Sequence, residues 1–180
     1  MSMNVYLDDR KKSDKCFYET HQPEILKHIE KSNIFLDNPV IPYKPASDED
    51  DIKNVTDTYI NKRPFQLRAQ FTETAKISTD KMHPTLRFER PNNATEIIKL
   101  TQMYNKGETL PYLLWVLADI TNVSIKKLII VDMQKLYDDK NEQNYKFKDK
   151  FTVKGNKDDS SSFIILDDPK FYIYSYIADN

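Results

Sequence analysis

Three polar side chains stand close together in the middle of the chain, in a segment that favours a β-hairpin. Asp57 precedes Gln66 by nine positions, and Arg68 follows Gln66 after one intervening residue. A tight hairpin would bring Asp57 beside the other two, and the two-residue period of a strand would place Gln66 and Arg68 on one face. Arg68 stays protonated at any relevant pH, so it can bind a phosphate but makes a poor general base. The segment therefore offers a carboxylate, a neutral amide and a permanent cation at one place.

The residues around this trio predict the hairpin itself. Residues 52–60 are rich in β-branched side chains, and the Asn-Lys-Arg-Pro sequence at residues 61–64 supplies a turn. Apolar and polar side chains alternate over residues 65–71, which is typical of a strand with one buried face. A third strand is expected over residues 85–90, with Leu86 and Phe88 turned inward and Arg87 outward.

Amphipathic segments on both sides of the hairpin predict two helices. The first covers residues 16–31, where apolar side chains form a stripe at Ile25, Leu26 and Ile29. The second covers residues 95–105, with Thr95 or Asn93 as its N-terminal cap. Between the first helix and the hairpin, residues 34–51 hold three prolines and an acidic end, which is typical of a loop.

Two long apolar runs predict the centre of a sheet. Residues 111–119 and 127–132 are apolar almost throughout, which indicates burial on both faces, and Trp115 is expected in the core. Shorter strands are expected at residues 162–166 and 171–177, the latter with tyrosines at alternate positions. The order of elements predicts an α/β (α+β) fold with a mixed central β-sheet, flanking helices and an αβββαβ-type core.

Composition narrows the class of protein. A length of 180 residues fits a single domain, and 39% hydrophobic with 31% charged side chains indicates a globular chain. Two glycines are too few for a Rossmann or P-loop phosphate site. The three histidines lack the spacing of a zincin motif, and the single cysteine excludes both an internal disulfide and a thiolate zinc cluster.

Charge and hydropathy bear on location and partners. The net charge is −1 and the mean hydropathy is −0.70, and no apolar run approaches the roughly 20 residues that span a bilayer. Residues 1–15 are polar, are expected to be flexible and lack the apolar core of a signal peptide. Residues 138–162 form a polar excursion that is expected to be mobile. These features predict a soluble protein of a bacterial or phage cytoplasm with no membrane partner.

The hairpin motif and the order of elements resemble the PD-(D/E)xK (restriction-endonuclease-like) nuclease superfamily. In that superfamily an Asp is followed, after a short gap, by Glu or Gln, any residue and Lys. Here Asp57 is followed by Gln66-Leu67-Arg68, and the resemblance covers residues 16–132. Two residues depart from the pattern, because Gln66 carries no charge and Arg68 stands in place of the Lys.

The resemblance implies a nuclease that cuts DNA phosphodiester bonds with the help of Mg²⁺ or Mn²⁺. It implies that Asp57 and Gln66 bind the metal and that an acid of the preceding helix, Glu19 or Glu24, joins them. It also implies that Arg68 stabilises the charge of the transition state. A site with a single firm carboxylate would hold Mg²⁺ weakly, so slow or partner-dependent cleavage is expected, with Mn²⁺ the better metal.

A local basic segment permits a nucleic-acid partner, which the resemblance implies to be DNA. Between Lys53 and Arg90 there are eight Lys or Arg against four Asp or Glu. Within it, the residues expected to contact the phosphate backbone are Arg63, Arg87 and Arg90. Nucleases of this kind often dimerise, so a homodimer or a protein partner is a further expectation.

Two alternatives to a nuclease stay open. A catalytically degenerate relative would bind nucleic acid or a protein without cutting, and the Gln and Arg of the motif would result from such decay. A small interaction protein, such as a phage accessory or anti-defence factor, would dock through the tyrosine-bearing strand at residues 171–177 as an exposed edge. Metal-dependent cleavage separates the first function from the other two, and salt-sensitive DNA binding without cleavage separates the second from the third.

Overall fold

The computed structural model describes residues 10–36, 38–40, 44–89, 95–155 and 161–179. A mixed sheet of six strands lies at the centre, in the order β1-β2-β3-β5-β6-β9. Its strands are β1 (Lys44–Pro45), β2 (Thr58–Ile60), β3 (Arg63–Thr72), β5 (Tyr112–Asp119), β6 (Ile125–Val131) and β9 (Tyr172–Ile177). The second, smaller sheet has the order β4-β8-β7, with bounds Thr85–Glu89, Ser162–Ile165 and Val153–Gly155. The predicted mixed sheet with flanking helices is confirmed.

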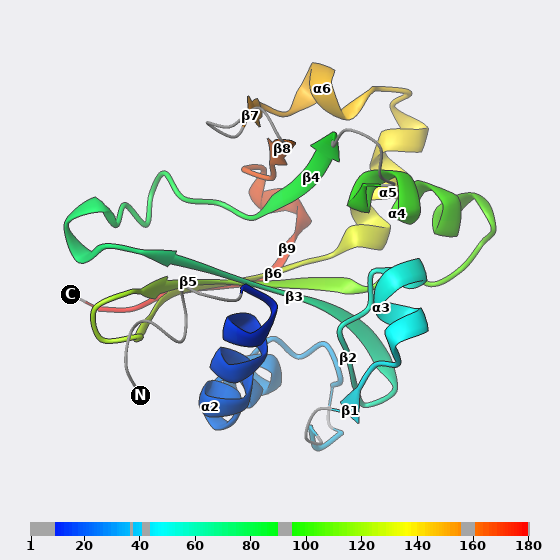
Figure 1. Ribbon diagram of the computed structural model, residues 1–180. Coiled ribbons are helices and arrows are strands. Elements are labelled where there is room, and N and C mark those ends of the chain that lie inside the picture. Colours follow the sequence, from blue (N-terminus) through cyan, green and yellow to red (C-terminus); the bar gives the residue numbers. More distant parts are fainter. Residues whose placement is uncertain (1–9, 37, 41–43, 90–94, 156–160, 180) are drawn as a thin grey trace.

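The helices lie on both faces of the central sheet (Figure 1). They are α2 (Arg10–Lys31), α3 (Asp48–Asn54), α4 (Glu96–Asn105), α5 (Met133–Glu142) and α6 (Phe147–Lys150), with short 3-10 turns η1 (Thr74–Lys76) and η2 (Pro169–Phe171). We call the face that carries Leu113, Trp115 and Leu117 the upper face; these side chains pack with α4, α5 and the second sheet. The opposite, lower face carries Leu114 and Val116 and packs against α2.

The predicted hairpin is present as β2 and β3. The two strands are antiparallel, with Thr58 opposite Phe65 and Ile60 opposite Arg63. Asn61 and Lys62 form the two-residue turn with φ of 48° and 64°, the left-handed pair that suits the twist of a hairpin. On β3, Gln66 and Arg68 lie opposite Leu113 and Trp115 of β5, so both belong to the upper face as the alternation predicts.

The first strand of the hairpin is shorter than the sequence suggests. The prediction of a strand from residue 52 is wrong, because residues 48–54 form the helix α3. Ser47 caps this helix by accepting a hydrogen bond from Asp50 N, and four acidic residues fill its first turn, where the helix dipole favours negative charge. Val55 ends the helix with a left-handed φ of 52°. Asp57 therefore lies just before β2, on the short segment that joins α3 to the hairpin.

The third predicted strand forms, but it leaves the central sheet. β4 pairs antiparallel with β8, whereas β3 pairs in parallel with β5 along its whole length. A parallel pair needs a long crossover connection, and here β4 and α4 supply it. The almost wholly apolar β5 takes the place beside β3 because it is buried on both faces. The predicted helices and strands of the core occur in the expected order, but β1 and α3 stand between α2 and β2 where a loop was expected, and the third strand builds a second layer above the upper face.

The segment at residues 138–162 has more regular structure than predicted. Helix α5 continues to Glu142, and α6 and β7 follow within the part of the segment that the structure describes. Phe147 and Phe151 are buried in the upper core, which anchors a stretch whose other side chains are mostly polar. The expectation of a mobile excursion is wrong over residues 138–155.

The predicted helix 95–105 and the predicted centre of the sheet are confirmed. Thr95 caps α4 by accepting from Ile98 N, and the helix ends before Gly107 at φ +72°. Trp115 is fully buried on β5, which pairs antiparallel with β6. β9 pairs with β6, and an irregularity in the register between Ile130 and Val131 divides its tyrosines between the two faces of the sheet. Within the described chain, no helix is both long and apolar enough to cross a membrane.

Candidate active site

Asp57 is held against the edge of β3 by two hydrogen bonds. Its N–H donates to the Phe65 carbonyl oxygen at 2.9 Å, and its Oδ2 accepts from Leu67 N at 2.6 Å. The carboxylate thus takes the place of a carbonyl in the β2–β3 ladder. Phe65 is also the β3 partner of Thr58, so Asp57 lies at the end of the β2–β3 ladder, beside Leu67. The hairpin therefore brings Asp57 beside Leu67, which lies between the two motif residues of β3, and close enough to Arg68 for their charges to interact.

A second acid, Asp51, meets Asp57. The two carboxyl groups share a hydrogen bond, because the left-handed turn at Val55 folds α3 back beside the hairpin. Burial raises the pKa of Asp57 to about 7, and the negative charge of Asp51 adds to this. The Leu67 N–H and the Arg68 charge act in the opposite direction. Ionisation of the Asp57 carboxyl is therefore costly at this place.

Arg68 forms an ion pair with Glu96 in the first turn of α4. The guanidinium Nη2 bonds to Glu96 Oε1, and both side chains are mostly buried, with exposed fractions of 22% and 13%. Glu96 Oε2 accepts a further hydrogen bond from the backbone N–H of Arg87 at 2.8 Å. Arg68 is close enough to Asp57 for its charge to lower the pKa of that carboxyl. The four charged residues therefore interact in sequence: Glu96 with Arg68, Arg68 with Asp57, and Asp57 with Asp51.

Gln66, the remaining motif residue of the hairpin, is buried. Its side chain is 3% exposed, and no donor within the described residues reaches its Oε1. A buried carbonyl oxygen without a partner is costly, and such an atom in a charged site points to a ligand or ion that the oxygen can bind. Gln66 lies on the same face as Arg68, two residues before it on β3.

The two helix acids expected at the metal lie elsewhere. Glu19 and Glu24 belong to α2, which covers the lower face, and both are exposed (Figure 1). Glu24 lies 3.7 Å from His21, one turn away on the same helix. Asp51 instead occupies the position beside Asp57 that the sequence assigned to a helix acid. The acidic run before the hairpin was the signal for Asp51, and the position of Glu96 just after a cap residue was the signal for Glu96.

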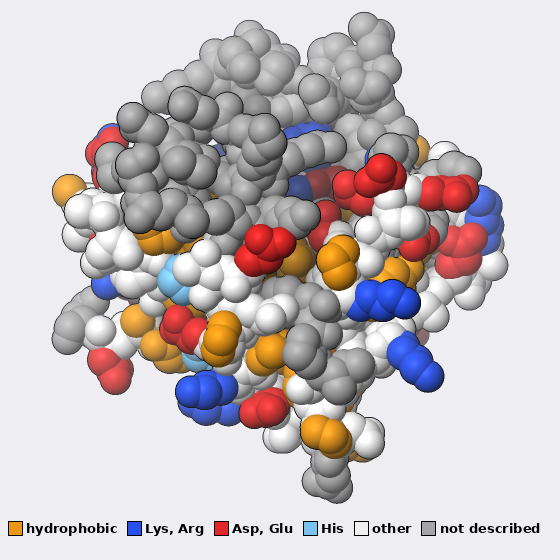
Figure 2. Space-filling view, turned by 60° about the horizontal axis from the view of Figure 1, so that its bottom comes forward, with side chains coloured by type: hydrophobic (Ala, Val, Ile, Leu, Met, Phe, Trp, Pro, Cys, Tyr) orange, Lys and Arg blue, Asp and Glu red, His pale blue; other side chains and the backbone are white. Residues whose placement is uncertain are grey.

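The arginines expected to contact nucleic acid do not form one surface. Arg63 lies over the ring of Tyr112 at 4.5 Å, on the lower-face side of β3. Arg87 lies on β4, 5.8 Å from the ring of Phe163, and its backbone reaches the site through Glu96. Arg90 lies outside the described residues. Figure 2 views the α2 side, where the coloured basic side chains are separated by apolar, acidic and uncharged ones and form no single patch.

The oxygen donors of the site suit a hard divalent cation, although they do not form a cluster of acids and histidines. The described residues contain no group of three or more His, Cys, Asp and Glu side chains that could hold a metal. The site instead offers two adjoining carboxyls, Asp51 and Asp57, and the unpartnered amide oxygen of Gln66. These are all oxygen donors, the type that Mg²⁺ and Mn²⁺ prefer.

Comparison with protein-family models, with curated proteins and with solved structures finds no match for this chain. The resemblance to the PD-(D/E)xK nucleases therefore rests on the residues of the hairpin and on their geometry.

Proposed function

We propose that this protein is a metal-dependent nuclease that cuts the phosphodiester bonds of DNA. The observation that carries the proposal is the meeting of Asp51 and Asp57 beside Arg68. Burial and the neighbouring Asp51 both oppose the ionisation of Asp57, and a cation bound between the two carboxyls would relieve this cost. A guanidinium next to such a pair suits a ligand that brings both negative charge and a need for metal, and a phosphodiester is such a ligand.

In this proposal Asp51, Asp57 and Gln66 would hold Mg²⁺ or Mn²⁺. The fit rests on the chemistry of the donors, since two carboxylates and an amide oxygen supply charge and hard ligands, with water or substrate completing the shell. The hairpin motif alone has one carboxylate and would hold Mg²⁺ weakly. Asp51 would add the second carboxylate that Gln66 does not provide. A divalent cation there would supply the Lewis acidity that stabilises a phosphoryl transition state and activates the attacking water.

The protein's own groups then have separate tasks. The Leu67 N–H fixes the Asp57 carboxylate through the 2.6 Å bond, so that this ligand is positioned before the substrate arrives. Arg68 would donate to the phosphate oxygens and stabilise the charge that develops on them. Its permanent charge suits this task and rules out a role as the base that removes a proton from water.

The test is cleavage of plasmid and single-stranded DNA with Mg²⁺ or Mn²⁺. The protein is expected to cut in a metal-dependent way, and Asp57→Asn and Asp51→Asn are expected to lose roughly 100-fold or more in rate. Asp48→Asn is the matched control, because Asp48 is an exposed acid of the same helix α3. Cleavage that is unaffected by Asp57→Asn, or no cleavage with either metal, would refute the proposal.

A second function, DNA binding without cleavage, is favoured by one observation. Arg68 is already bonded to Glu96, so part of its charge is neutralised within the protein. Arg68→Lys separates the two functions. In a nuclease this change is expected to preserve or raise turnover, because Lys is the residue of the superfamily motif. In a protein that only binds, it is expected merely to weaken salt-sensitive DNA binding.

A further inference from the structure

We propose that Glu96 is a positioning residue, which holds the Arg68 guanidinium at the place where a backbone phosphate of nucleic acid would bind. The inference rests on the proposed function and adds a residue that the hairpin motif does not contain. Its basis is the Arg68–Glu96 ion pair together with the backbone bond that fixes Glu96.

Glu96 is anchored independently of Arg68. Its Oε2 accepts from the backbone N–H of Arg87 at 2.8 Å, so β4 holds one side of the carboxylate. Glu96 itself begins α4 directly after Thr95, the residue whose side chain caps that helix. The Glu96 carboxylate is thus held by the Arg87 N–H of β4, while its backbone is held in the first turn of α4, so Glu96 is the fixed member of the pair.

Arg68 is the member that needs to be fixed. It extends from β3 on a long flexible side chain, and its charge acts on the Asp57 carboxyl, which itself meets Asp51. Without Glu96, the guanidinium would be drawn to those carboxyls and would compete there with a divalent cation. A guanidinium has five N–H donors in a planar fork, so its bond to Glu96 leaves it able to donate to a phosphate as well. Glu96 therefore gives the guanidinium a carboxylate partner other than Asp57 and fixes its position.

The test is a double-mutant cycle on DNA cleavage with Glu96→Gln, Arg68→Gln and the double variant. Glu96→Gln is expected to lower kcat roughly 10- to 100-fold, the usual range for residues that orient a functional side chain. KM should change little, since the loss falls on transition-state stabilisation. In the Arg68→Gln background, Glu96→Gln should have no further effect, because Glu96 acts through Arg68.

Two further variants separate positioning from a general role in folding. Glu96→Asp keeps the charge and is expected to recover part of the lost kcat, while Glu73→Gln removes an exposed ion pair with Lys76 and should change nothing. Thermal unfolding of each variant is recorded alongside. The inference would be overturned if Glu96→Gln still lowered kcat in the Arg68→Gln background. It would also be overturned if Glu96→Gln alone left kcat unchanged.

The failure of this inference differs from a failure of the proposed function. If the unsubstituted protein cuts DNA but the cycle is additive, only the role of Glu96 is wrong. If the protein binds DNA without cutting, the cycle is read from the salt dependence of binding. Arg68→Gln should then lower the slope of log K against log salt by about 0.9, and Glu96→Gln should lower it only when Arg68 is present. If neither cleavage nor salt-sensitive binding occurs, both proposals are refuted.

Discussion

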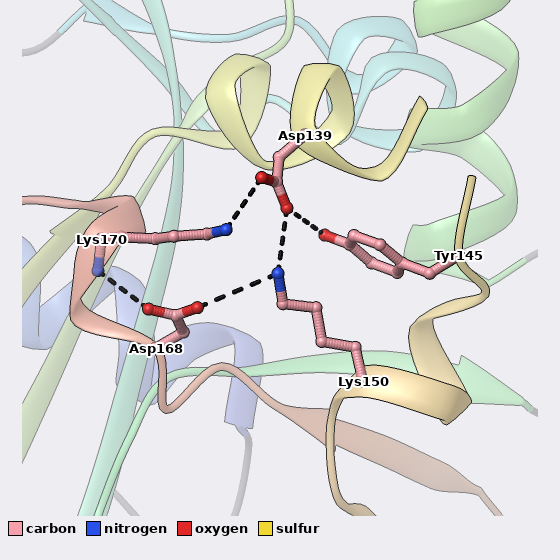
Figure 3. A network of polar contacts seen from close by, with 5 residues as sticks. All are labelled: Asp139, Tyr145, Lys150, Asp168 and Lys170. Atoms are coloured by element: carbon pink, nitrogen blue, oxygen red, sulfur yellow. Dashed lines mark hydrogen bonds and ion pairs between the residues drawn. The ribbon is translucent and has the colours of Figure 1, made fainter. Parts of the chain in front are cut away.

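Two charged clusters in this molecule use the same kinds of side chain and reach opposite results. Around Asp139 of α5, Lys170 donates to Oδ1 at 2.8 Å, and Lys150 and Tyr145 donate to Oδ2 at 3.0 and 2.9 Å (Figure 3). The bonds from Lys170 and Lys150 hold the pKa of Asp139 well below its usual range. Around Asp57, burial and the neighbouring Asp51 raise the pKa to about 7.

The difference lies in how well each cluster satisfies its own members. In the Asp139 cluster two acids, Asp139 and Asp168, are balanced by Lys150 and Lys170, and the residues come from α5, α6, η2 and the cap of η2 (Figure 3). Such a network fastens the second layer together. The Asp57 cluster holds more acid than cation, and the buried Gln66 oxygen beside it lacks a donor among the described residues. A fold keeps an unsatisfied charged group most readily where binding or catalysis needs it.

The largest expected effects come from making the same substitution in both clusters. Asp57→Asn should reduce cleavage roughly 100-fold or more while the unfolding temperature stays the same or rises, because Asn still accepts from Leu67 N and the repulsion with Asp51 is gone. Asp139→Asn should do the reverse and lower the unfolding temperature by several degrees with cleavage retained. Calorimetry and the plasmid assay together check both. Loss of stability in Asp57→Asn with full activity would break the comparison.

The pH dependence of stability should show the sign of the Asp139 shift. A carboxyl whose pKa is lower in the folded than in the unfolded chain stabilises the fold above its unfolded pKa, which is about 4 for Asp. This stabilisation is lost as the pH falls through the folded pKa. The gap in unfolding temperature between the unsubstituted protein and Asp139→Asn should thus be full at neutral pH and narrow below about pH 4. A gap that widens in acid would contradict the assignment.

Gln66→Glu would sharpen the comparison by adding a third acid to the unsatisfied cluster. Because Gln66 is 3% exposed, a carboxylate there should lower the free energy of unfolding by about 1–3 kcal/mol without metal. Mn²⁺ should restore that stability, and cleavage should rise. Unfolding with and without Mn²⁺ measures the effect, and Gln70→Glu, further along the same face of β3, is the matched control.

The smallest effects are expected on the lower side of the sheet. Glu19→Ala and Glu24→Ala should leave metal-dependent cleavage within about twofold of the starting value and change the free energy of unfolding by no more than about 0.5 kcal/mol. Both side chains are exposed on α2, away from the upper face. A larger loss of cleavage in either variant would indicate that an acid of α2 belongs to the metal site after all.

Local sequence patterns were enough to predict much of the fold, whereas the rest depends on contacts between segments distant in the sequence. Strict alternation on β3 predicted that Gln66 and Arg68 share a face, and the apolar run around Trp115 predicted the central strand. The position of β4 was not predictable from its own residues. Its strand pattern is correct, but its partner β8 lies far along the chain, so pairing depends on which apolar surfaces meet.

The candidate site divides in the same way. The hairpin spacing predicted the meeting of Asp57 and Arg68, because the register of a short turn is a local property. Asp51 and Glu96 come from helices on either side, and their approach depends on the turn at Val55 and on the packing of α4. A charge pattern alone does not state which of four consecutive acids will turn toward the hairpin.

The most direct test of the central claim is to measure Mn²⁺ binding to the full chain by calorimetric titration. We expect the unsubstituted protein to bind one Mn²⁺. Asp57→Asn and Asp51→Asn should weaken the affinity by at least about tenfold, as loss of a metal ligand requires. Asp139→Asn, which removes an acid from the satisfied cluster, should bind as the unsubstituted protein does. Equal Mn²⁺ affinity in all four proteins, or no binding at all, would contradict the account.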